Sequence, residues 1–111
     1  MSYEVELSFR AEKDLDHILA WIADRSPQGA RSWLARWKEV CRLLSERPES
    51  CLVAPENADH EEDIRHIVFK TRSGRKYRAL FVMGGNRVFV TNLRGPGQDL
   101  VPPDEMPVPN D

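Results

Sequence analysis

The strongest constraint on the fold is a periodic apolar stripe in the first half of the chain. Between residues 30 and 44, apolar side chains recur at intervals of three and one residues, which places them on one face of an α-helix. The stripe consists of Ala30, Trp33, Leu34, Trp37, Val40, Cys41 and Leu44. Pro48 follows and is expected to end the helix. Because such a helix must bury its apolar face, the chain is expected to contain a second layer that this helix covers.

Another amphipathic helix is predicted immediately before this one, over residues 11–25. Its apolar positions are Leu15, Ile18, Leu19 and Ile22. The pair Ser26-Pro27 interrupts the pattern and suits the start of the next helix, with serine as the N-cap and proline in the first turn. So short a connection predicts an antiparallel helical hairpin. We interpret Trp33 and Trp37 as core residues rather than a stacking platform for nucleic-acid bases, since both lie on the stripe.

Four strands are predicted around the hairpin. Residues 3–9 alternate between apolar and polar side chains, and further strands are expected at 64–71, 76–83 and 87–93. The connectors RSGR and GGN suit turns. Residues 48–63 show no regular period and are expected to be irregular. The predicted fold class is therefore α+β, in the order β-α-α-β-β-β, with the helical hairpin packed on one face of a small, mainly antiparallel four-stranded sheet.

The length and composition fit a single domain. The chain has 111 residues, enough for one core. We expect the domain to cover residues 1–100 and the proline-rich residues 101–111 to form a flexible tail. The sequence shows neither a long apolar run nor a signal-peptide pattern, which favours a cytoplasmic protein without membrane contact. The cysteines and histidines are scattered, so no metal site, disulfide framework or cofactor is predicted.

Charge is distributed unevenly along the chain, although the formal net charge is only -2. Residues 64–98 contain eight basic side chains and no acid, whereas residues 48–63 contain six acids and no lysine or arginine. The eight are Arg65, Lys70, Arg72, Arg75, Lys76, Arg78, Arg87 and Arg94. Such a segment favours an anionic partner. A solvated sheet edge protected by lysine and arginine would give the same pattern and remains an alternative.

The last two predicted strands are apolar on both sides, which is unusual for an antiparallel sheet with one face in water. Two helices can cover only one face. The other face is therefore predicted to be an open apolar surface that binds a partner. Its residues would be Leu80, Val82, Val88 and Val90. The alternative is that residues 48–63 or the C-terminal tail fold over this face.

The turn between these strands decides which side chains share that face. A two-residue turn formed by Gly84 and Gly85 would place Arg78 and Arg94 on opposite faces of the sheet. A three-residue loop over residues 84–86 would pair Arg78 with Asn92 and Lys76 with Arg94, all on the apolar face. We predict the three-residue loop. The result would be an apolar floor with a cationic rim, suited to a phosphate or a carboxylate.

A set of short motifs follows one another along residues 3–100. They are a first strand ending in Phe9, the segment AEKDLDHILAWI, Ala-x-x-Trp-Leu at 30–34, Pro55-Glu56, Ile64-Arg65, Tyr77-Arg78 and VFVTNLRG with Arg94. In order and spacing, the chain resembles the RelE/ParE superfamily, the toxins of type II toxin–antitoxin modules. The resemblance implies a growth-inhibiting toxin neutralised by a cognate antitoxin, which would lie over the open sheet face or the helical hairpin.

The superfamily divides by mechanism. RelE-type members are ribosome-dependent mRNA endonucleases, and the resemblance would make Arg78 and Arg94 the arginines that stabilise charge on the phosphate. Such enzymes also carry a tyrosine or histidine near the C-terminus, which this chain lacks, so Asp99 and His66 are the remaining candidates for proton transfer. ParE-type members inhibit DNA gyrase through protein contacts, without catalytic residues of their own.

The missing C-terminal acid or base favours a gyrase-type target. A ribosome-dependent mRNA endonuclease is the alternative, in which case the partner would be the ribosome and its mRNA. A nucleic-acid-binding relative without toxicity is a further possibility. The candidate residues for binding an anion or the target are Arg65, Lys70, Arg72, Arg75, Lys76 and Arg87.

Overall fold

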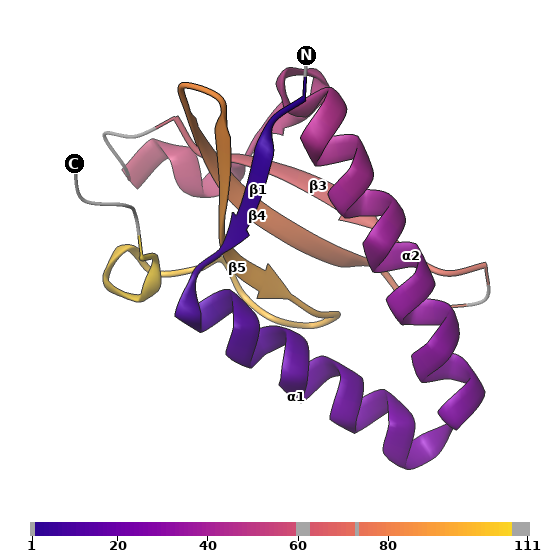
Figure 1. Ribbon diagram of the computed structural model, residues 1–111. Helices are drawn as coiled ribbons and strands as arrows, with labels where there is room; N and C mark the ends of the chain where they lie inside the picture. The colour runs from indigo at the N-terminus through magenta and orange to yellow at the C-terminus, as the bar shows by residue number, and fades with distance from the viewer. Residues whose placement is uncertain (1, 60–62, 73, 108–111) are drawn as a thin grey trace.

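Two helices cross one face of a twisted sheet in the computed structural model, which describes residues 2–59, 63–72 and 74–107 (Figure 1). The main elements are β1 (Glu4–Leu7), α1 (Phe9–Arg25), α2 (Pro27–Glu46), β3 (Arg65–Phe69), β4 (Tyr77–Gly84) and β5 (Arg87–Arg94). Their order confirms the predicted α+β fold and its helical hairpin. None of the described helices combines the length and apolarity needed to cross a membrane.

The sheet has five strands in the order β1-β5-β4-β3-β2, not the four predicted. The extra strand is β2 (Leu52–Val53), which pairs antiparallel with the start of β3. It lies in the segment expected to be irregular, between short 3-10 helices at Pro48–Ser50 and Pro55–Asp59. β1 is parallel to β5, and the other pairs are antiparallel. The sheet is therefore mainly antiparallel, as predicted.

The first helix begins two residues earlier than its apolar pattern indicates, at Phe9. Ser8 caps it, because the Ser8 Oγ accepts a hydrogen bond from the Ala11 N–H at 2.9 Å. The same hydroxyl donates to the Thr91 carbonyl at 2.7 Å, which joins the helix start to β5. Phe9 was predicted to end the first strand on its apolar face, but it lies in the helix and is 72% exposed.

The core on the helix side is aromatic. The Trp33 ring lies 6.3 Å from Trp37, 5.6 Å from Phe69 and 5.4 Å from Tyr77, measured between ring centroids. Trp33 and Trp37 are only 2% and 5% exposed, which confirms them as core residues. The helical stripe thus packs on aromatic side chains at the end of β3 and the start of β4. The rings meet in stacked, tilted and edge-on geometries, which aromatic pairs favour.

The β4–β5 hairpin differs from the prediction. Gly84 pairs with Arg87, so the turn contains two residues, Gly85 and Asn86, and not three. Gly85 has a φ of 59°, the left-handed conformation that glycine adopts without strain at the first position of such a turn. The predicted loop over residues 84–86 is therefore wrong.

A β-bulge farther along the hairpin changes which side chains share a face. Phe81 pairs with Val90 and Leu80 with Asn92, which leaves Thr91 as the extra residue. The two-residue turn, not the bulge, separates the predicted apolar residues, because it pairs Val82 with Phe89 and Met83 with Val88. Val88 and Val90 therefore point into the core beneath the helices, while Leu80 and Val82 belong to a second cluster on the other side of the sheet. The four residues predicted to form one surface are thus split between the two faces. The bulge also brings Arg78 opposite Arg94.

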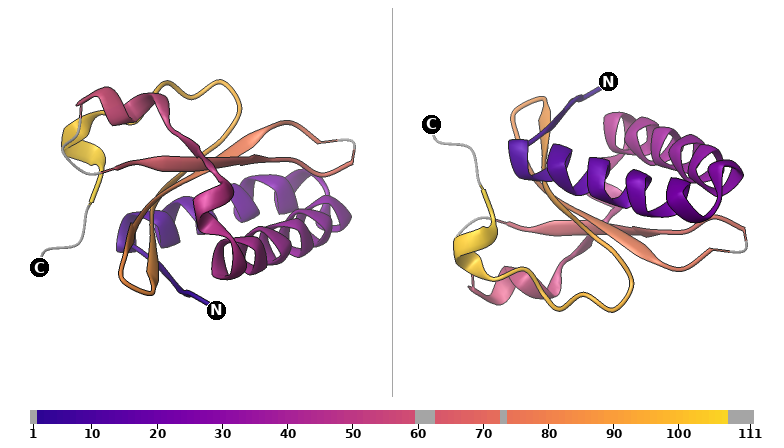
Figure 2. Two further views of the ribbon diagram at one scale, coloured as in Figure 1. Left: turned by 90° about the horizontal axis from the view of Figure 1, so that it is seen from above. Right: turned by 90° about the horizontal axis from the view of Figure 1, so that it is seen from below.

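The face away from the helices is closed by the chain itself, so the prediction of an open apolar surface is wrong. Its apolar cluster consists of Ala54, Ile64, Leu80, Val82, Val101 and Met106. Leu80 and Val82 are 0% and 4% exposed. Two segments cover the sheet on the side opposite the helices, as Figure 2 shows: the segment around Pro55–Asp59 and residues 100–107. Residues 100–107 are here called the C-terminal strap. Residues 101–107, assigned above to a flexible tail, pack on the sheet through Val101 and Met106.

Candidate functional site

A buried ion pair lies at the centre of the covered face. Arg78, on β4, donates to both carboxylate oxygens of Glu56, at 3.0 Å to Oε1 and 2.6 Å to Oε2. The Glu56 side chain is 1% exposed, and that of Arg78 is 18% exposed. Glu56 Oε2 also accepts the backbone N–H of Val101 at 3.1 Å. One carboxylate therefore joins the Pro55–Asp59 segment, β4 and the C-terminal strap.

The contacts of this ion pair shift the pKa values of Glu56 and of the neighbouring His66. Burial alone would raise the pKa of Glu56, but the hydrogen bonds from Arg78 and the Val101 N–H hold that pKa below its usual value. His66 Nδ1 lies 3.1 Å from an Arg78 nitrogen. Burial and the Arg78 charge lower the pKa of His66, and Glu56 offsets this only in part. His66 is therefore neutral near pH 7, with Nδ1 placed to accept from the guanidinium.

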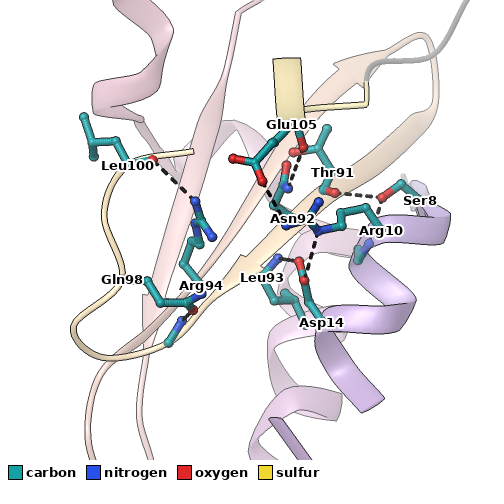
Figure 3. Close-up of polar contacts among 12 residues, drawn as sticks. Ser8, Arg10, Asp14, Thr91, Asn92, Leu93, Arg94, Gln98, Leu100 and Glu105 are labelled. Atoms are coloured by element: carbon teal, nitrogen blue, oxygen red, sulfur yellow. Dashed lines mark hydrogen bonds and ion pairs between the residues drawn. The ribbon is translucent and has the colours of Figure 1, made fainter. Parts of the chain in front are cut away.

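Arg94 and Asn92 face the C-terminal strap (Figure 3). A terminal nitrogen of Arg94 donates to the Leu100 carbonyl at 3.4 Å, and Asn92 Nδ2 donates to the Glu105 carbonyl at 3.1 Å. Arg94 Nε and Asn92 Oδ1 are buried without a hydrogen-bond partner in the described parts of the chain. The strap thus covers these polar groups but satisfies only some of them.

Side chains of α1 complete the edge of β5 where β1 stops. β1 accompanies β5 only as far as the pair Leu7–Val90. Beyond it, Asp14 Oδ2 accepts the Leu93 N–H at 2.9 Å. Arg10 contacts Asp14 at 3.3 Å and Glu105 at 3.5 Å, as Figure 3 shows. The start of α1, the end of β5 and the strap are thereby joined.

The structure does not bring the eight predicted basic residues together. Arg87 lies beside the hairpin turn and pairs with Glu6 at 2.5 and 2.7 Å. Arg65 donates to the Cys51 carbonyl at 2.7 Å and pairs with Asp63 at 3.4 Å. Arg78 and Arg94 face the strap. The remaining four lie in and beside the β3–β4 connection and form no ion pair with any described residue: Lys70, Arg72, Arg75 and Lys76.

Sequence reasoning missed a cleft on the helix side of the sheet. Its volume is about 390 Å³, and it lies between α1, the start of β4 and the loop after β5. Trp21, Arg75 and Tyr77 are among its lining residues. Burial raises the pKa of Tyr77, and the charge of Arg75 acts against that shift. Trp21 lies outside the predicted apolar stripe of the first helix. That position could have indicated, from the sequence alone, that its side chain has a role other than core packing.

Comparisons with known proteins agree with the fold. A family model described as "ParE toxin of type II toxin-antitoxin system, parDE" matches residues 5–99. No curated protein sequence matches the chain. A solved structure titled "Chromosomal ParDE TA system from P. aeruginosa" is similar with a TM-score of 0.63 and 14% identity, over 85% of this chain and 96% of that chain. Because the family model spans most of the sequence, the chain belongs to the ParE toxin family of type II toxin–antitoxin systems.

Proposed function

We propose that the chain inhibits growth as a toxin that binds an essential protein machine of the DNA gyrase type, without catalysing a reaction itself. Membership of the ParE family implies an antitoxin partner. The remaining question is whether the toxin acts by cleavage or by binding. The arrangement of Arg78 supports binding.

The observation that carries the proposal is the engagement of Arg78 with Glu56. A ribonuclease needs a cation free to stabilise the charge that develops on the phosphate. Here the Arg78 guanidinium already donates hydrogen bonds to both carboxylate oxygens of Glu56, at 2.6 and 3.0 Å. Moving Arg78 to a phosphate would leave a buried carboxylate without its cation, at a penalty of several kcal/mol. Arg78 therefore fits a structural role better than a catalytic one.

Arg94 is no better placed for catalysis. Its terminal nitrogen is turned to the Leu100 carbonyl, under the C-terminal strap (Figure 3). Catalysis by proton transfer would also require a base within hydrogen-bond reach of the ribose hydroxyl. The Nδ1 atom of His66 lies 3.1 Å from an Arg78 nitrogen and is directed at that guanidinium. These contacts favour a toxin that works through its surface.

Supercoiling by gyrase in the presence of the purified toxin tests the proposal. We expect inhibition that does not depend on ribosomes and that is unchanged in His66→Ala. The cognate antitoxin, added in excess, should restore supercoiling. Full gyrase activity at toxin concentrations that arrest growth would contradict the proposal.

An mRNA endonuclease of RelE type is the second candidate, and one observation favours it. His66 Nδ1 and the Glu56 carboxylate both lie within hydrogen-bond distance of Arg78, so two titratable groups and a cation are gathered at one place. For this candidate, purified toxin would cut mRNA only on translating ribosomes. Both His66→Ala and Arg94→Ala would abolish the cleavage.

A further inference from the structure

The cleft beside α1 has an aromatic wall that the core does not use. Trp21 is 56% exposed, in contrast to the buried Trp33 and Trp37. The Arg25 guanidinium lies over its ring, 3.8 Å from the centroid, and donates to the Trp21 carbonyl at 2.9 Å. A large aromatic surface beside a concave site is the usual setting for a binding anchor.

The cleft is lined by one acidic side chain and one arginine, Asp14 and Arg75, and they differ in whether they have a partner. Asp14 is its one acidic lining residue, and both of its oxygens are already engaged, Oδ1 by Arg10 and Oδ2 by the Leu93 N–H. Arg75, which also lines the cleft, has no acidic partner among the residues the structure describes. Its guanidinium is free to bind a carboxylate or phosphate in the fork geometry that arginine favours.

We propose that this cleft, between Trp21 and Arg75, binds an acidic segment of the cognate antitoxin, with an apolar side chain against the indole and a carboxylate on the guanidinium. The inference rests on the proposed function, because it takes the antitoxin as the partner. The lining residues of α1 run from Asp14 to Trp21, about two helical turns or roughly 10 Å. That length suits a few residues of a peptide chain.

A protein segment fits better than nucleic acid. Nucleic-acid binding depends on many cation–phosphate contacts, and the cleft offers a single arginine, Arg75, together with the carboxylate of Asp14. The chain's net charge of -2 also disfavours a polyanion. A single carboxylate next to an apolar side chain matches the groups that the cleft presents.

The test is the affinity of the full chain for the cognate antitoxin, measured by calorimetry. Arg75→Glu and Trp21→Ala should each weaken binding by about tenfold or more, as expected for anchors in a concave site. Arg72→Glu is the matched control, because it makes the same charge change in the same β3–β4 connection outside the cleft. It should change the affinity by less than about threefold, since rim charges contribute little.

Trp21 fluorescence supplies a second measurement, because the other two tryptophans are buried. Iodide should quench the free toxin, and antitoxin should remove most of that quenching. Unchanged affinity in Arg75→Glu and Trp21→Ala, or quenching unaffected by antitoxin, would show that antitoxin does not bind in the cleft. Either result would leave the proposed function unaffected. Tight Arg75-dependent binding of a single-stranded oligonucleotide in place of antitoxin would also overturn antitoxin binding in the cleft. A wild-type chain that neither binds antitoxin nor arrests growth would instead remove the proposed function itself.

Discussion

The two faces of the sheet are closed in different ways. On one face, two long amphipathic helices bury an almost wholly apolar core that contains Trp33, Trp37, Phe69 and Tyr77. On the other, a 3-10 segment and the C-terminal strap cover the sheet (Figure 2). They bury a smaller apolar cluster around an ion pair. The first face therefore depends on packing, while the second depends on packing and on charge.

The difference shows where stability and specificity reside. Burial of apolar area involves no titrating group, and it suits a permanent core. A buried ion pair contributes little net stability over an apolar pair of the same shape, but removal of one partner is strongly destabilising. The strap face should consequently respond to charge changes that leave the helix face intact.

The largest effect is expected on the helix face. Trp37→Ala removes a ring that is 5% exposed and stacked against Trp33. The free energy of unfolding should fall by about 3–5 kcal/mol, measured by urea denaturation. A midpoint that barely moved would break the assignment of this face as the main core.

On the strap face, Arg78→Ala leaves Glu56 buried and unpaired. We expect a loss of about 3 kcal/mol, at the low end for buried pairs because Arg78 is itself partly exposed. Arg94→Ala is the comparison, since its contact is a single hydrogen bond at 3.4 Å. Equal stability of Arg78→Ala and wild type would mean that the pair does not hold this face together.

The strap itself can be tested with a smaller change. Met106→Ala should lower the free energy of unfolding by about 2 kcal/mol, because Met106 is 6% exposed within the second cluster. Leu100→Ala, in the same strap but 53% exposed, should have little effect. Thermal unfolding distinguishes them. Equal and negligible shifts would show that the strap contributes nothing to the fold.

Acid should weaken the strap face before the helix face. The folded-state pKa values of His66 and Glu56 are both lowered, so the unfolded chain binds protons more readily. Their contributions are complete above the unfolded values, about 6.5 and 4.3, and are lost as pH falls through the folded values. Stability measured against pH should decline less steeply in His66→Gln, between about pH 6.5 and 5. Trp37→Ala should keep the wild-type slope.

The smallest effect is expected at the hairpin turn. Arg87 and Glu6 form a close pair, but both side chains are largely in water, 59% and 42% exposed. Exposed pairs of this kind contribute little. The melting temperature of Arg87→Ala should equal that of the wild type within error. A clear drop would mean that the Arg87–Glu6 pair, next to the β1–β5 pairing, contributes more to stability than an exposed pair should.

Much of the fold could be predicted because it rests on local patterns. The helical hairpin follows from the stripe and the Ser26-Pro27 break, and the order of the elements along the chain, apart from β2, follows from the apolar patterns of the other strands. The bulge at Thr91 could not be predicted, since it depends on Ser8 and α1 meeting β5 from elsewhere in the chain. The register next to the turn was wrong for a local reason, because the turn consists of Gly85 and Asn86 and Gly84 pairs with Arg87.

The candidate site was less accessible to sequence reasoning. Charge asymmetry indicated that Arg78 and its neighbours needed an anion, but the anion is Glu56 from the chain's own acidic segment. The pairing spans 22 positions and carries no periodic signal. The cleft at Trp21 combines residues from a helix, a strand end and a loop, which only the tertiary structure brings together.

The most direct test of this account is the coupling between Glu56 and Arg78. Unfolding free energies of Glu56→Leu, Arg78→Leu and the double variant form a thermodynamic cycle. If the pair closes the second face, each single variant should lose stability and the double variant should recover much of it, because no unpaired buried charge remains. Strictly additive losses, or an Arg78→Leu variant as stable as wild type, would contradict the claim that Arg78 is held by Glu56 and leave it free for an external anion.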